Sequence, residues 1–167
     1  DYIKTNNVII DAILNSKYKE TLDKGIVFIF QINDLSGIKM RDEDIVVILS
    51  NLLNNAMKHN ESGTHIKIGM YRKNGYIYIL VADSGRRIPG ELAEHLFEPF
   101  TKGDVSRKSG SGSGLGLSIA KKIIEMHGFQ MDFIQQLDEK KIPQIAGYTK
   151  EFVIQIADDS YDSSLTA

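Results

Sequence analysis

The sequence lacks cysteine and tryptophan and has only three prolines in 167 residues. Without cysteine the chain can form no disulfide, no thiolate zinc site and no cysteine nucleophile. Neither sign of charge dominates, because 20 Lys and Arg stand against 22 Asp and Glu, and the net charge of −2 gives no electrostatic case for nucleic-acid binding. Long hydrophobic runs are also missing: the stretch at 25–30 is far shorter than the roughly 20 residues that a membrane-spanning helix needs.

What remains is a globular composition, with 42% hydrophobic and 25% charged residues, enough to build one hydrophobic core. We expect a single domain over residues 1–157 and a disordered polar tail at 158–167. Helical spacing of apolar residues predicts helices near 6–24, 42–60, 91–97 and 115–127. Alternating or β-branched runs predict strands near 26–32, 65–71, 76–82, 130–135 and 149–156. This order predicts an α/β (α+β) two-layer sandwich, with a mostly antiparallel mixed sheet and helices on one face.

Two asparagines, Asn51 and Asn55, lie four residues apart on the most apolar predicted helix. This spacing puts both side chains on one face of the helix. Helical asparagines are often solvated or act as caps, but an asparagine carbonyl is also a hard oxygen ligand that suits Mg²⁺. The pair by itself leaves both interpretations open.

Residues 110–118 form a glycine- and serine-rich tract that ends where a predicted helix starts. Glycines let backbone N–H groups approach an anion closely, and a helix N-terminus adds its dipole. The tract is not a Walker loop, because no Lys-Ser or Lys-Thr pair follows the glycines, and no strand leads into it as in a dinucleotide fingerprint. A flexible linker is the alternative, but the glycines adjoin an amphipathic helix, which favours a phosphate-binding loop.

Asp83 closes the second strand of a predicted hairpin and precedes Ser84 and Gly85. An Asx turn is the most common use of aspartate in this position. The functional alternative is a buried carboxylate that accepts a hydrogen bond from an exocyclic amine, such as that of adenine.

Taken in order, these features closely resemble the catalytic, ATP-binding domain of sensor histidine kinases, which belongs to the Bergerat-fold group with gyrase, Hsp90 and MutL. Residues 51–59 resemble the N box of that family, 96–100 its F box and 112–117 its second glycine box. The resemblance covers about residues 5–156. It implies a cytoplasmic catalytic domain cut from a longer kinase, and leaves open whether the parent protein is anchored in the plasma membrane.

The resemblance also implies roles for individual residues. Asn55 is expected to hold the Mg²⁺ that bridges the ATP phosphates, and Asn55 and Lys58 are the expected catalytic residues. Asp83 is expected to bind the adenine amino group, with Gly85 allowing close approach of the base. Residues 101–113 would form a mobile ATP lid. Phe97 and Phe100 would anchor its root, and packing in the core is the alternative role for these two rings, which does not exclude the first. The other expected nucleotide contacts are Asn51, His59, Ile88, Phe100, Thr101, Lys102, Gly112, Gly114, Leu115, Gly116 and Leu117.

Position 51 favours a kinase over an ATPase within this group. Hydrolysing members typically carry there a glutamate that activates water, and Asn51 cannot act as that base. We therefore expect transfer of the γ-phosphoryl group of ATP to a histidine on a dimerisation domain absent from this chain, and onward transfer to a response regulator. None of the four histidines here is a convincing acceptor.

Arg87 is a departure from the family pattern, because it stands where Asp-x-Gly-x-Gly has its second glycine. If that position needs a positive φ, arginine costs on the order of 1 kcal/mol in backbone strain. Arg87 could obstruct ATP, stiffen the lid or point into solvent without effect. A degenerate nucleotide-binding regulatory module therefore stays an alternative, as does a free-standing ATPase or serine kinase of the same fold.

Overall fold

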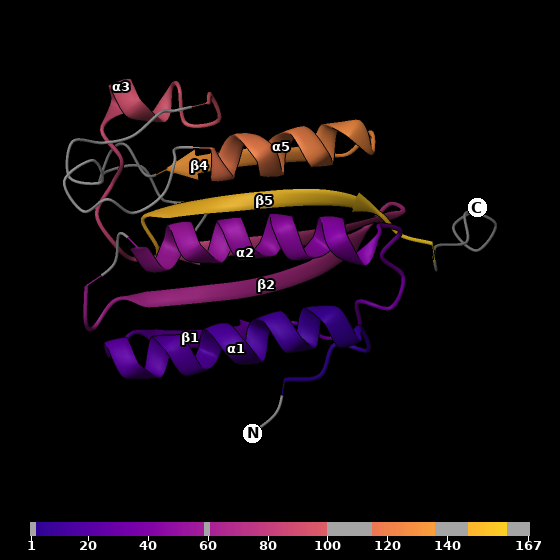
Figure 1. Cartoon of the computed structure of the whole chain (residues 1–167), viewed down its shortest axis with the longest axis horizontal. Coiled ribbons are helices and arrows are strands. Elements are labelled where there is room, and N and C mark those ends of the chain that lie inside the picture. The colour runs from indigo at the N-terminus through magenta and orange to yellow at the C-terminus, as the bar shows by residue number, and fades with distance from the viewer. Residues whose placement is uncertain (1–2, 59–60, 100–114, 136–146, 160–167) are drawn as a thin grey trace.

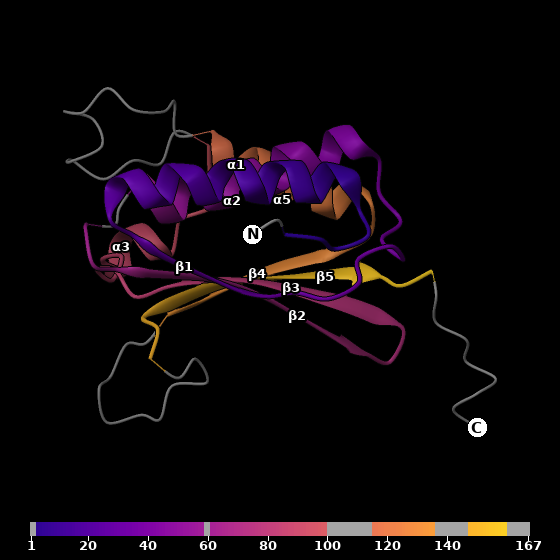
Figure 2. The same cartoon turned by 90° about the horizontal axis from the view of Figure 1, so that it is seen from below.

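The computed structural model describes residues 3–58, 61–99, 115–135 and 147–159. In chain order the elements are α1 (Val8–Lys24), β1 (Val27–Gln31), α2 (Asp42–Lys58), β2 (His65–Lys73), β3 (Tyr76–Asp83), α3 (Gly90–Ala93), α5 (Gly116–Met126), β4 (Gln130–Gln135) and β5 (Lys150–Ala157). The strands form one sheet in the order β1-β2-β3-β5-β4. β1 runs parallel to β2, and the other neighbouring pairs are antiparallel. Helices α1, α2 and α5 lie on one face of this sheet (Figure 1, Figure 2), which confirms the expected two-layer sandwich.

Local sequence signals explain where several elements begin and end. The side chain of Asn7 caps α1 by accepting a 3.0 Å hydrogen bond from the N–H of Ile10, and Gly25 ends the helix in the left-handed conformation, with φ 68°. The β2–β3 turn places Asn74 at φ 52° and Gly75 at φ 84°. Both values are positive, as the tight turn of a two-residue hairpin requires.

The core is centred on α2, which lies between α1 and α5 in the helical layer that covers the sheet (Figure 1, Figure 2). Its buried residues are Ile45, Ile48, Leu49, Leu52, Leu53, Ala56 and Met57. They pack with inward-facing strand residues that include Ile66, Ile68, Ile77, Ile79 and Val81. Burial of each large side chain contributes about 1.5–3 kcal/mol. Packing on this side fixes the rotation of α2, so that the residues at 51, 55 and 58 share its opposite, polar side.

Helices α2 and α5 pack against each other in opposite directions. Near the start of α2, Asp44 Oδ2 lies 2.8 Å from Nε2 of His127, which directly follows α5. At the other end, Gly116 at the start of α5 lies against the side chain of Asn51. The N-terminus of α5 is therefore placed beside the C-terminal half of α2.

The expected helix at 91–97 is wrong in its extent, because α3 covers only Gly90–Ala93. The next residues continue in tighter turns, in which the N–H of His95 donates to the carbonyl of Leu92 and that of Glu98 to the carbonyl of His95. Near the C-terminal end of the described residues, Asp158 and Asp159 form polar contacts with the rest of the domain, although we expected them to belong to the tail. Asp158 pairs with Arg72 at 2.6 Å, and the N–H of Asp159 donates to the carbonyl of Gly37 at 3.0 Å.

Candidate functional site

The candidate residues converge at one end of the sandwich, the left-hand end in Figure 1. Asp83 ends β3 and pairs with Ile66 near the start of β2 and with Lys150 at the start of β5. α2 ends at Lys58, shortly before β2 begins, and α5 begins beside the C-terminal half of α2. Segments that are far apart in the sequence are thus brought to one site.

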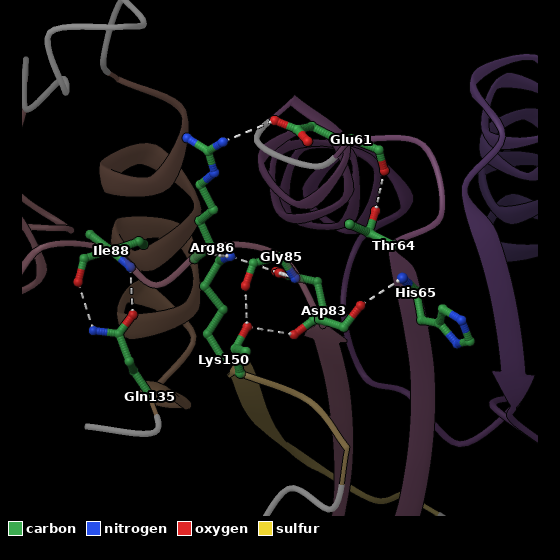
Figure 3. A network of polar contacts seen from close by, with 11 residues as sticks. Glu61, Thr64, His65, Asp83, Gly85, Arg86, Ile88, Gln135 and Lys150 are labelled. Atoms are coloured by element: carbon green, nitrogen blue, oxygen red, sulfur yellow. Dashed lines mark hydrogen bonds and ion pairs between the residues drawn. The ribbon is translucent and has the colours of Figure 1, made fainter. Parts of the chain in front are cut away.

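Asp83 is a buried carboxylate, with 3% of its surface exposed. Its Oδ1 accepts a hydrogen bond from the N–H of Gly85 at 2.9 Å, which is the Asx turn considered from the sequence. The same oxygen forms an ion pair with Nζ of Lys150 at 2.7 Å (Figure 3). Lys150 Nζ also donates to the carbonyl of Arg86 at 2.5 Å. The Asx turn and the buried charged group therefore occur together at Asp83.

The loop after β3 is held on two sides by other strands. The hydroxyl of Thr149 donates to the carbonyl oxygens of Gly85, at 2.6 Å, and of Asp83, at 3.1 Å. The Gln135 side chain pairs with the backbone of Ile88: it accepts from the N–H at 2.7 Å and donates to the carbonyl at 2.8 Å (Figure 3). Residues from β4 and from the segment just before β5 therefore fix the loop that carries Gly85 and Ile88.

Arg87 does not have the positive φ that would make an arginine strained at this position. Among the described residues other than glycine, positive φ occurs only at Asn6 and Asn74. Arg87 is exposed, and its neighbour Arg86 reaches Glu61 at 3.2 Å in a solvent-exposed pair. The position does not require glycine in this structure, so the strain argument against a working site no longer holds.

The polar face of α2 carries one unusual atom. The Oδ1 of Asn55 is buried and, within the described ranges, is the single buried side-chain nitrogen or oxygen without a hydrogen-bond partner. An unsatisfied buried acceptor is costly and calls for an explanation. A hard amide oxygen without a donor fits a Mg²⁺ ligand. Lys58, on the same face one turn later, is exposed at the end of α2.

Asn51 and Gly116 form the contact between α2 and α5. The Asn51 side chain donates to the carbonyl of Val47 at 2.8 Å, and its Oδ1 would lie 2.6 Å from a Cβ atom added at position 116. A side chain at 116 would therefore displace Asn51 or α5. Leu115 and Leu117, on either side of this glycine, are half-buried. The structure thus gives Gly116 a packing role besides its expected place beside the phosphates.

Phe97 of the F box packs into the core. Its ring meets that of Phe152 edge-on, with centroids 6.0 Å apart, and the ammonium of Lys121 lies 4.3 Å from the centre of the Phe97 ring. These contacts hold the segment that leads toward position 100. The remaining expected site residues lie outside the described residues: His59, Phe100, Thr101, Lys102, Gly112 and Gly114.

Sequence reasoning missed Lys150, Thr149 and Gln135. Lys150 gave a usable signal, because it begins an alternating series whose other members, Phe152, Ile154 and Ile156, are apolar and buried. A charged residue at an inward position predicts a buried partner. The sequence does not say that this partner is Asp83.

These features together define a class of protein. The sandwich has two layers, a buried aspartate after a hairpin strand, and asparagines on the polar face of the central helix. This combination is an ATP-binding domain of the Bergerat type. The family model for "Histidine kinase-, DNA gyrase B-, and HSP90-like ATPase" matches residues 40–159. The chain belongs to this family.

Known relatives point to one branch of it. Sensor histidine kinase YvrG of Bacillus subtilis (strain 168) is 40% identical over 80 residues, which cover 48% of this chain and 14% of that protein. Sensor protein GtcS of Aneurinibacillus migulanus is 33% identical over 122 residues, or 73% of this chain and 31% of that protein. The chain spans less than a third of the length of either relative. Among solved structures, the catalytic domain of histidine kinase ThkA matches with a TM-score of 0.73 and 25% identity, over 95% of this chain and 96% of that one.

These findings confirm the resemblance to the catalytic, ATP-binding domain of a two-component histidine kinase. They favour neither a degenerate module nor a free-standing ATPase. In the part of the chain that the structure describes, every helix is too short or too polar to cross a membrane.

Proposed function

We propose that this chain binds ATP with Mg²⁺ between the polar face of α2, the loop after β3 and the start of α5, and transfers the γ-phosphoryl group to a histidine on a dimerisation domain. A response regulator then receives the phosphoryl group. The observation that carries the proposal is the buried, partnerless Oδ1 of Asn55. The similarity to sensor histidine kinases supports it, and a solved structure of the kinase ThkA in complex with the response regulator protein TrrA supports the choice of downstream partner.

At the base end of the site, Asp83 accepts a hydrogen bond from the exocyclic amine of adenine. Its Oδ1 already has two partners, Gly85 N–H and Lys150, whereas no described residue donates to Oδ2. The loop that carries Gly85 and Ile88 is fixed by Thr149 and Gln135, so the base meets a surface that needs little rearrangement.

At the phosphate end, Asn55 Oδ1 would hold the metal, with Asn51 supporting it from one turn earlier. When bound, Mg²⁺ would supply positive charge that neutralises the charge developing on the phosphates during transfer. The Lys58 ammonium adds positive charge on the same face of α2. The amide N–H groups at the start of α5, from Gly116 and Leu117, and the helix dipole attract the phosphates. The proposal extends to His59, Phe100, Thr101, Lys102, Gly112, Gly114 and Leu115 as further nucleotide contacts.

The reaction needs no base from this chain. A ring nitrogen of the acceptor histidine attacks the γ-phosphorus, the bond from that phosphorus to the β,γ-bridging oxygen breaks, and ADP leaves. The amide of Asn51 cannot take a proton from water, which disfavours hydrolysis as a competing reaction.

Calorimetric titration with ADP, with and without Mg²⁺, tests this proposal. We expect Asn55→Ala to lose most of the Mg²⁺-dependent gain in ADP affinity. Asn54→Ala is the matched control, because that exposed side chain is on the next position of the same helix but accepts from Lys17 of α1 at 2.7 Å. A folded wild-type chain that fails to bind ADP, or equal effects of the two substitutions, would contradict the proposal.

A further inference from the structure

Lys150 is a buried ammonium group that faces the proposed base pocket. It is 1% exposed, and its Nζ lies 2.7 Å from Asp83 Oδ1 and 2.5 Å from the carbonyl oxygen of Arg86. An ammonium is buried at this depth only when it is paired. Both partners belong to the end of β3 and the loop that follows it, so Lys150 acts on that segment.

We propose that Lys150 is a positioning residue that sets base specificity by holding Asp83 as an ionised, oriented hydrogen-bond acceptor. The inference rests on the proposed function, in which Asp83 meets the base. An ionised carboxylate has no proton to donate. It therefore accepts from a purine with an amine at position 6 and repels one with a carbonyl oxygen there.

The geometry assigns different tasks to the two carboxylate oxygens of Asp83. Oδ1 is engaged by the Gly85 N–H and by Lys150, which fixes the plane of the carboxylate and leaves Oδ2 for the base. The cross-strand pairing of Asp83 with Lys150 fixes their separation through the backbones of β3 and β5. The bond from Lys150 to the Arg86 carbonyl ties the same ammonium to the loop.

Without the ammonium, Asp83 would keep one N–H donor in a site that is 3% exposed. A buried carboxylate without a cation tends to take up a proton. A protonated carboxyl can donate to the position-6 oxygen of hypoxanthine or guanine, so the preference for adenine would weaken. This effect depends on charge, and a role of Lys150 in packing alone would not produce it.

The test compares ADP with inosine diphosphate, in which a carbonyl oxygen replaces the amine at position 6. Calorimetric titration of the whole chain at about pH 6 and about pH 8 gives the affinity ratio of the two ligands. We expect the wild type to prefer ADP by about 100-fold or more at both pH values. Lys150→Met is expected to lower the ratio by about tenfold or more at the lower pH, with partial recovery at the higher pH.

The matched control is Lys122→Met, which removes a lysine at an exposed position of α5 and is expected to keep the wild-type ratio. The other charged or titratable side chains near this end of the elements around Asp83 include His65 and Lys67 of β2, Glu151 of β5, Lys58 of α2, and Glu61, Arg86, Arg87 and Tyr148 of the flanking segments. The ring of His65 points away from Asp83 (Figure 3), and His65→Gln serves as the control for any contribution of that side chain.

Three results would overturn the inference. The first is a folded Lys150→Met chain with the wild-type ratio at both pH values, and the second is an equal loss of affinity for both ligands. The third applies if Lys150→Met does not fold. In that case Lys150→Gln, which removes the charge but keeps a hydrogen-bond donor, takes its place in the test. A wild-type ratio of ADP to inosine diphosphate affinity in Lys150→Gln overturns the inference. If the wild-type chain binds neither ligand, the proposed function itself fails, which is a distinct outcome.

Discussion

Gly116→Ala offers the sharpest test of how α2 and α5 meet at the site. A Cβ atom at position 116 would lie 2.6 Å from Asn51 Oδ1 and 3.2 Å from its Cγ. Contacts below about 3 Å between such atoms are strongly repulsive, so either Asn51 or the start of α5 must move. Asn51 cannot turn away without cost, because its amide donates to the carbonyl of Val47 at 2.8 Å.

The expected magnitude follows from two opposing effects. Overpacking of this kind costs about 1–3 kcal/mol, whereas alanine is favoured over glycine within a helix by about 0.5–1 kcal/mol. We therefore expect Gly116→Ala to lower the free energy of unfolding by about 1 kcal/mol, and by no more than about 2.5 kcal/mol. In an Asn51→Ala background the colliding atoms are gone, and the Asn51 Cβ, at 3.7 Å, is in ordinary contact. There the same substitution should be neutral or stabilising.

Urea unfolding followed by circular dichroism measures the stability of the wild type, the two single variants and the double variant of this double-mutant cycle. The comparison is valid when the four proteins have the same dependence of unfolding free energy on urea concentration. The coupling energy between positions 51 and 116 should be about 1–3 kcal/mol. The same loss on Gly116→Ala in both backgrounds would refute the packing argument, because the cost would then not come from Asn51.

Three further predictions concern the pH dependence of stability and a helix cap. Burial raises the pKa of Glu151 above the usual 4.5, against the opposing charge of Lys67, so the wild type loses stability as the pH rises from the unfolded to the folded pKa. Urea midpoints should therefore show Glu151→Gln gaining on the wild type across that window, and a constant difference would count against this assignment. A hydrogen bond from His127 is the main cause that lowers the pKa of Asp44 below 3.8. The stability that this hydrogen bond contributes is present above the unfolded pKa of Asp44 and is lost as the pH falls through the folded pKa. Thermal midpoints of His127→Gln should therefore fall less on acidification than those of the wild type. Asn7→Ala removes the cap of α1 and should cost about 1 kcal/mol in urea unfolding, whereas an unchanged midpoint would show that the cap contributes nothing.

The sequence by itself determined the order and kind of the elements, because hydrophobic periodicity and turn chemistry are local properties. The apolar stripe of α2 follows from its residues, and with it the shared polar side of Asn51 and Asn55. Asn74 and Gly75 determine the hairpin. The ordered boxes of the family pattern identified the domain type, and the family match over residues 40–159 confirmed it.

Only the tertiary structure decided which distant residues meet. The pairing of β5 with β3 puts Lys150 beside Asp83, and the antiparallel packing of α2 and α5 puts Gly116 against Asn51. Strand order and register arise from the packing of the whole core, which no local pattern encodes. The same holds for Arg87, whose backbone conformation depends on how neighbouring strands hold the loop. Local patterns thus determined which residue types the site contains, while long-range packing determined how far apart they lie.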